Sequence, residues 1–154
     1  MGLHTVNRAL LLLVVFVGCQ VGRPPPAAGP FKVHQVIASS AEPGLKDALK
    51  SGLGQALTAR GVLDAGGQAI NVAVLRADSS PSAVGPNSQM HTARLQVSVQ
   101  SGSRSAQFSS ERSYSVIDPV QGAAARAAAF DALAHQLMRD GVMWLSNAPQ
   151  GIQP

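Results

Sequence analysis

The chain has 154 residues, of which 12 are Lys or Arg and 8 are Asp or Glu, so its formal net charge is +4. This length is enough for one globular domain after a leader peptide. The basic residues are dispersed along the chain and do not form the runs that indicate nucleic-acid binding. Because the chain has a single cysteine, no disulfide can form within it.

An apolar run of nine residues, 9–17, follows a weakly basic start. A membrane-spanning helix needs about 20 apolar residues, so this run predicts the core of a secretory signal peptide. Residues 16–19 (Phe-Val-Gly-Cys) resemble a bacterial lipobox. The resemblance implies cleavage before Cys19 and attachment of a diacylglycerol and an N-acyl chain to it; the alternative is an incidental or buried thiol. Gln20 replaces the Asp that tends to retain such lipoproteins in the inner membrane, which favours the periplasmic side of the outer membrane.

The composition divides the chain into four segments. Residues 1–18 are the predicted signal peptide, and residues 19–30 are the lipidated cysteine with a tether rich in Pro and Gly. Residues 31–147 are predicted to form a single α+β domain, and residues 148–154 a short tail.

The domain begins with the patterns of a strand and a helix. Residues 31–39 alternate imperfectly between polar and apolar side chains and predict a strand. Ser39 and Glu42 have the spacing of a capping box, which predicts the start of a helix. Leucine at every fourth position over residues 45–57 gives that helix an apolar stripe, and Gly61 is expected to end it. We expect Gly52 and Gly54, inside the stripe, to allow close approach to a sheet.

Three strands and one long loop are predicted next. Residues 69–76 are apolar on both faces, which predicts a central strand. Residues 78–89 are rich in Ser, Pro, Gly and Asn and predict a long loop of the kind that often carries function. Residues 91–100 alternate strictly and predict a strand with one buried and one solvated face. A hairpin turn then leads into a strand over residues 104–116.

The last predicted element is a long amphipathic helix. Asp118 and Pro119 are a favourable cap and first residue, and apolar side chains recur at helical spacing over residues 130–145. The order strand, helix, three strands, helix predicts an α+β fold. In this fold two helices pack on one face of a four-stranded, mainly antiparallel sheet.

The domain contains no recognisable catalytic motif, and its histidines lack the spacing of metal ligands. We therefore expect no catalytic residue, no metal, and no cofactor beyond the acyl chains on Cys19. An enzyme whose site is assembled from distant residues is the alternative. Arg94, Arg112 and Arg126 are candidates to bind phosphate groups, because a guanidinium group can contact phosphate through two hydrogen bonds. Their alternative role is that of solvated surface charges.

Residues 42–145 resemble LptE-type lipopolysaccharide-assembly lipoproteins. The likeness rests on Glu-Pro-Gly-Leu-Lys-Asp-Ala-Leu at residues 42–49, on the alternating strand, on Arg-Ser-Tyr-Ser-Val-Ile-Asp at residues 112–118, and on the Ala-rich last helix. It implies a protein without enzymatic activity that plugs the lumen of an outer-membrane β-barrel, contacts lipopolysaccharide and helps deliver it to the outer leaflet. In that family a basic residue near the start of the last helix contacts lipid, and Arg126 matches it best. The resemblance thus predicts weaker lipopolysaccharide binding by Arg126→Ala, with unchanged folding.

The expected partners are an outer-membrane β-barrel protein, lipopolysaccharide and, through the lipid anchor, the membrane, but no nucleic acid. Two other functions stay open. The lipobox, the order of elements and Met-Trp-Leu at residues 143–145 are similar to PqiC-type auxiliary lipoproteins of MCE lipid transporters. An envelope enzyme of unknown reaction is the third possibility.

Overall fold

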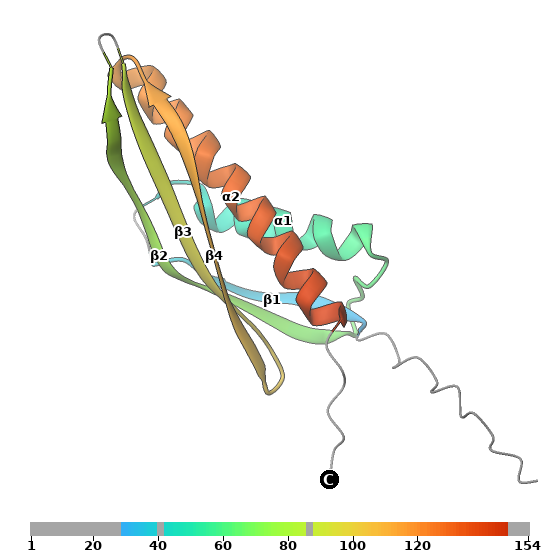
Figure 1. Cartoon of the computed structure of the whole chain (residues 1–154). Coiled ribbons are helices and arrows are strands. Elements are labelled where there is room, and N and C mark those ends of the chain that lie inside the picture. Colours follow the sequence, from blue (N-terminus) through green and yellow to red (C-terminus); the bar gives the residue numbers. More distant parts are fainter. Residues whose placement is uncertain (1–28, 40–41, 86–87, 148–154) are drawn as a thin grey trace, which may run out of the picture.

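The structure is a computed structural model that describes residues 29–39, 42–85 and 88–147. Two helices pack on one face of a four-stranded sheet (Figure 1). The elements follow in the order β1 (Phe31–Ile37), α1 (Leu45–Ala59), β2 (Gln68–Val84), β3 (Gln89–Ser101), β4 (Arg104–Val116) and α2 (Pro119–Asn147). The predicted α+β fold and its order of elements are confirmed. The predicted signal peptide and Cys19 lie outside the described residues.

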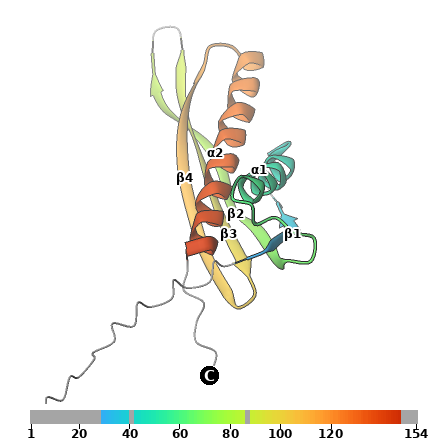
Figure 2. The ribbon, with the colours of Figure 1, turned by 90° about the vertical axis from the view of Figure 1, so that its right-hand side faces the viewer.

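The sheet has the strand order β1-β2-β3-β4. β1 runs parallel to β2, because α1 forms the crossover between them, and the other neighbouring strands are antiparallel. β2 is central where it pairs with β1, as its two apolar faces predict. Viewed from the side, both helices lie on the same face of the sheet and leave the other face open (Figure 2).

β2 is much longer than the sequence predicts. It continues to Val84, so residues 78–84 form a strand and not the predicted long loop. Asp78 pairs with Arg94 of β3 in the ladder, and the Arg94 guanidinium donates a hydrogen bond to Ser80 Oγ at 2.9 Å. Antiparallel pairing with a strongly alternating neighbour therefore overrides the loop-like composition of this segment. A shift of register between Pro81 and Ala83 accommodates the proline.

The start of α1 differs from the predicted one. Gly44, with φ of 76°, precedes the helix, and no side chain caps its first turn. The capping box predicted from Ser39 and Glu42 is therefore wrong, and Glu42 pairs instead with Arg126 of α2. The positive φ explains the glycine, because residues with a Cβ rarely adopt this conformation.

The other helix boundaries follow the sequence. α1 ends before Gly61, which has φ of 65° and reverses the chain. Asp118 caps α2, because its Oδ1 accepts hydrogen bonds from the backbone N–H groups of Val120 and Gln121 at 3.0 and 2.9 Å. Within the described residues, no helix combines the length and the apolar character that crossing a membrane requires.

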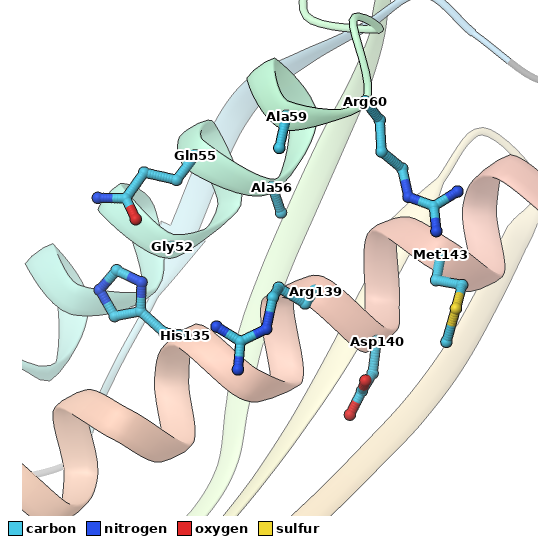
Figure 3. Close-up of a pocket in the computed structure, with 9 residues that line it drawn as sticks. All are labelled: Gly52, Gln55, Ala56, Ala59, Arg60, His135, Arg139, Asp140 and Met143. Atoms are coloured by element: carbon cyan, nitrogen blue, oxygen red, sulfur yellow. The ribbon is translucent and has the colours of Figure 1, made fainter.

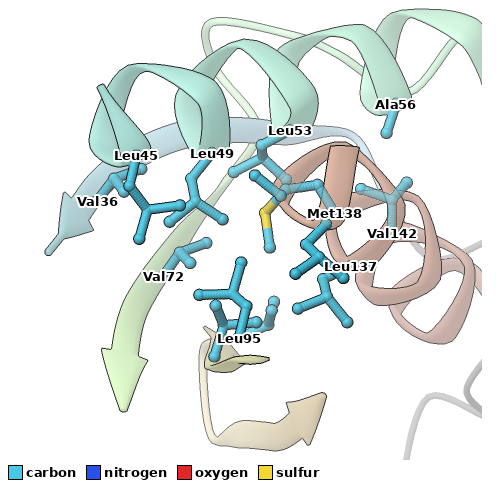
Figure 4. Close-up of a cluster of buried hydrophobic side chains, with 14 of the residues drawn as sticks. Val36, Leu45, Leu49, Leu53, Ala56, Val72, Leu95, Leu137, Met138 and Val142 are labelled. Atoms are coloured by element: carbon cyan, nitrogen blue, oxygen red, sulfur yellow. The ribbon is translucent and has the colours of Figure 1, made fainter. Parts of the chain in front are cut away.

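The hydrophobic core lies between the two helices and the covered face of the sheet (Figure 4). The leucine stripe of α1 is buried as predicted, and α2 buries side chains at intervals of three or four residues. The largest fully buried side chains are Phe31, Phe130, Leu45, Leu49, Leu53, Leu57, Ile70, Leu95, Leu133, Leu137, Met138 and Leu145.

Candidate functional site

The structure does not bring the three predicted phosphate-binding arginines together. Arg94 lies on the open face of the sheet, 3.8 Å from Asp78 and 3.4 Å from Glu111. Arg112 pairs with Ala93, which is buried beneath the helices, so Arg112 projects from the covered side of the sheet at β4. These two arginines therefore belong to opposite faces.

Arg94 is part of a row of alternating charges across the open face. Arg76 donates hydrogen bonds to the carboxylate of Asp78, and Arg94 follows between Asp78 and Glu111. The hydrogen bond from Arg76 lowers the pKa of Asp78. Because each cation in the row faces a carboxylate, little positive potential is left there for an external anion.

Arg126 joins α2 to the segment before α1. Its Nε and Nη2 lie 2.9 and 2.7 Å from Oε2 of Glu42. The side chain of Glu42 is only 5% exposed, whereas that of Arg126 is 45% exposed. The guanidinium carbon of Arg126 also lies 5.8 Å from the ring centre of Phe130. These contacts give Arg126 a structural role that the sequence did not reveal, and its lipid contact stays a prediction.

A groove of about 460 Å³ lies on the surface where α1 and α2 pack together (Figure 3). Gly52 allows the two helices to approach each other, because a Cβ at this position would lie 3.1 Å from Cα of His135. The prediction that Gly52 and Gly54 approach the sheet is therefore wrong. Gly52 lies against α2, and a Cβ at Gly54 would have no neighbour within 4 Å. The groove is lined by Gly52, Gln55, Ala56, Ala59, Arg60, His135, Arg139, Asp140 and Met143.

The groove combines positive charge with small and apolar side chains. Arg60, at the end of α1, and Arg139 of α2 stand on its two sides, with Ala56 and Ala59 between them (Figure 3). The carboxylate of Asp140 points away from α1. The net charge facing the groove is therefore positive.

Arg60 and Arg139 differ from most arginines of the domain. Arg76, Arg94 and Arg126 contact carboxylates, and Arg104 donates hydrogen bonds to two backbone carbonyl oxygens at the end of α2. The side chains of Arg60 and Arg139 make no ion pair or hydrogen bond with the residues that the structure describes. Both guanidinium groups can therefore bind an external anion without breaking an existing contact.

His135 of α2 is another titratable side chain that lines the groove. Its Nε2 lies 3.8 Å from Oδ1 of Asp131, one helical turn earlier in α2. Among the described residues, no three side chains of His, Cys, Asp or Glu gather as a metal ion requires. The chemistry that the lining residues offer is the binding of an anion that also carries apolar surface.

Sequence reasoning missed this site because Arg60 and Arg139 belong to helices far apart in the chain. One signal pointed to it: a glycine within a leucine stripe allows close contact between helices. His135 and Arg139 share the side of α2 that meets this glycine, because residues four apart lie on one helix face.

Comparisons with known proteins give likeness in fold only. No protein-family model matches the chain, and no curated protein sequence matches it. Among solved structures, a minor lipoprotein from Acinetobacter baumannii is 22% identical, with 84% of this chain and 100% of that chain covered and a TM-score of 0.50. A DUF330 protein from Xanthomonas campestris is 20% identical, with 79% and 88% covered and a TM-score of 0.48. Rare lipoprotein B from Shewanella oneidensis is 10% identical, with 74% of this chain and 89% of that chain covered and a TM-score of 0.37. The chain thus shares its fold with a bacterial lipoprotein.

Proposed function

We propose that this protein is a lipid-anchored lipoprotein of the bacterial outer membrane. In this proposal Cys19 carries the acyl chains, and the domain assists lipopolysaccharide transport as the partner of a β-barrel protein. The groove between α1 and α2 binds the phosphorylated lipid. The observation that carries the proposal is the pair of arginines, Arg60 and Arg139, on either side of an apolar floor.

The groove supports an anionic amphiphile as its ligand. Two guanidinium groups on opposite sides suit a phosphate group, which each can contact through charge-assisted hydrogen bonds. The floor of Ala56 and Ala59, together with Met143, which is 45% exposed, offers apolar surface to the adjoining part of the ligand. A simple inorganic anion would contact only the guanidinium groups, whereas a phosphorylated lipid contacts both the guanidinium groups and the apolar surface.

The role proposed is binding and not catalysis. Positive charge and apolar contacts on rigid helices hold a lipid, and its release to a partner requires no bond to break. The acyl groups on Cys19 are the only non-protein groups that this function needs. Their anchoring is physically sufficient, because more than one acyl chain gives stable attachment to a bilayer.

The first test is lipopolysaccharide binding by the full-length, lipidated protein in detergent. We expect the double variant Arg60→Ala/Arg139→Ala to bind at least about 10-fold more weakly, because each charge-assisted contact contributes about 1.5–3 kcal/mol and 1.4 kcal/mol is tenfold. The matched control is Lys46→Ala/Lys50→Ala, which removes two exposed charges from α1 at positions outside the groove.

Three outcomes of this test are informative. Weaker binding by the groove variant alone supports the proposal. Equal weakening by both variants would indicate nonspecific attraction to charge, and native binding by the groove variant would exclude the groove. Competition separates the ligand sources: inorganic phosphate should displace lipopolysaccharide poorly, because it cannot use the apolar floor.

The second test is purification of the solubilised protein from its own envelope, followed by mass spectrometry of what accompanies it. A large β-barrel protein together with lipopolysaccharide supports the proposed partner. An MCE-domain protein would instead indicate an auxiliary lipoprotein of a lipid transporter. Recovery of neither would contradict the proposed partnership, whatever the binding assay shows.

A further inference from the structure

Four apolar side chains are exposed at one end of the molecule. Val84 ends β2 and is 77% exposed, Met90 of β3 is 37% exposed, Ile117 follows β4 and is 67% exposed, and Val120 in the first turn of α2 is 81% exposed. The strands bring these segments together, because Val84 pairs with Gln89 and Gln89 pairs with Val116. We call these four residues the apolar tip.

The apolar tip lies far from both ends of the domain. The start of α2 and the end of β2 are at the top of Figure 1, whereas β1 begins, and α2 ends, near the opposite end. α2 has 29 residues, which at 1.5 Å per residue separates the ends by about 44 Å. The tip is therefore the part of the domain most distant from the tether.

The surroundings of the apolar tip carry almost no charge. Residues 81–90 contain no Asp, Glu, Lys or Arg, and residues 113–125 contain only Asp118. The carboxylate of Asp118 accepts hydrogen bonds from two backbone N–H groups at the start of α2. The backbone N–H of Gly85 donates to the carbonyl oxygen of Ser88 at 2.8 Å. The Asp118 carboxylate and the Gly85 N–H are therefore paired within the protein, which lowers the cost of moving these groups out of water.

We propose that the apolar tip inserts into the acyl-chain region of a lipid bilayer. The tip is a protruding end made of aliphatic side chains from three segments. Because it has no positive charge, its insertion should not depend on anionic lipid, in contrast to binding in the groove.

The chain before the domain is long enough for this contact. The eleven residues between Cys19 and Phe31 span at most about 40 Å when fully extended. This reach is close to the length of the domain, so the lipidated cysteine and the tip can enter one bilayer at the same time. The domain would then lie lengthwise on the membrane. The lengthwise orientation of the domain on the membrane depends on the anchor at Cys19. The insertion of the tip and the binding of lipopolysaccharide in the groove do not depend on it.

A fluorophore at the tip tests the inference. In the lipidated full-length protein the sulfur of Cys19 is acylated, so Val84→Cys introduces a single thiol that can be labelled. The protein is reconstituted into phosphatidylcholine vesicles with or without bromine on the acyl chains. We expect bromine to quench a label at residue 84 at least about twofold more than a label at Ser103→Cys in the β3–β4 turn, which is exposed. Adding anionic lipid should leave this ratio unchanged.

A variant of the tip supplies the control. Ile117→Asp/Val120→Asp places charges at exposed positions near the start of a helix, where acidic residues are tolerated. It should remove most of the quenching at residue 84 while lipopolysaccharide binding stays native. Equal quenching at residues 84 and 103 would overturn the inference. So would a label that is shielded in native envelope fragments but unquenched in pure vesicles, because a protein would then cover the tip.

Discussion

The two ends of this domain are built in opposite ways. The base contains β1, α1, residues 68–74 of β2 and the second half of α2, and it holds most of the fully buried side chains. The arm contains residues 75–84 of β2, residues 89–95 of β3, residues 109–116 of β4 and the first half of α2. In the arm, no residue of β2 from position 75 onwards is buried.

The difference shows how one small domain separates stability from exposed surface. The base buries apolar stripes from two helices, and apolar burial is the main source of folding free energy. The arm buries fewer side chains, among them Ala93 and Leu95 of β3. It also depends on its backbone ladder and on close contact between α2 and β4, where a Cβ at Gly122 would lie 2.7 Å from Cγ1 of Val116. The arm can therefore carry exposed apolar side chains because the base stabilises the fold.

The largest expected effect is the loss of a leucine from the base. Leu49 is completely buried, so Leu49→Ala should lower the free energy of unfolding by about 2–5 kcal/mol, the range for creating a core cavity. The matched change in the arm, Val84→Ala, removes apolar atoms from a side chain that is 77% exposed and should change stability by no more than about 0.5 kcal/mol. Urea denaturation measures both, and similar losses would contradict the division into base and arm.

The base was easier to predict from the sequence than the arm. Leucine at every fourth position of α1 and the apolar spacing of α2 are local patterns, and the structure buries both stripes. Residues 78–84 have the composition of a loop, yet they form a strand because β3 lies beside them. A hydrogen bond links Ser80 to Arg94 of β3, and another reaches from Ser79 across β3 to Tyr114 of β4. Such contacts between distant residues are invisible in the local sequence.

The candidate site shows the same limit. Arginines were selected by residue type and by position on predicted elements, and Arg94 and Arg126 prove to be engaged by carboxylates. Arg60 and Arg139 line one groove only because α1 packs against α2 at Gly52. The sequence supplied the glycine, but the pairing of these two helix faces depends on the tertiary structure.

A second, smaller effect is expected where base and arm are joined by Arg126 and Glu42. Arg126→Ala leaves the Glu42 carboxylate, whose side chain is 5% exposed, without its partner. Unfolding should become easier by about 1–3 kcal/mol, the cost of an unsatisfied buried polar group. Glu42→Gln in the same chain should restore part of the loss. Chemical denaturation of the two single variants and the double variant gives the coupling energy.

This experiment also separates two roles of Arg126. The family resemblance predicts weaker lipopolysaccharide binding with unchanged folding, whereas the contacts with Glu42 predict reduced stability. Binding must therefore be measured where both proteins are fully folded. An Arg126→Ala variant of native stability would show that the Glu42 pair contributes little. Unchanged binding would place the lipid contact elsewhere.

The smallest expected effect is a pH dependence confined to the arm. The hydrogen bond from Arg76 lowers the pKa of Asp78 below its ordinary value of 3.8. Because the folded-state pKa is the lower one, ionised Asp78 stabilises the arm above the unfolded-state pKa, and this contribution disappears as the pH falls through the folded-state pKa. Hydrogen exchange of residues 76–80 should therefore accelerate more steeply in acid for the native protein than for Asp78→Asn. Amides of the base, such as that of Leu49, should respond alike in both proteins. An equal acid response of the arm in the two proteins would show that the Arg76–Asp78 pair contributes nothing measurable, as exposed ion pairs often do not.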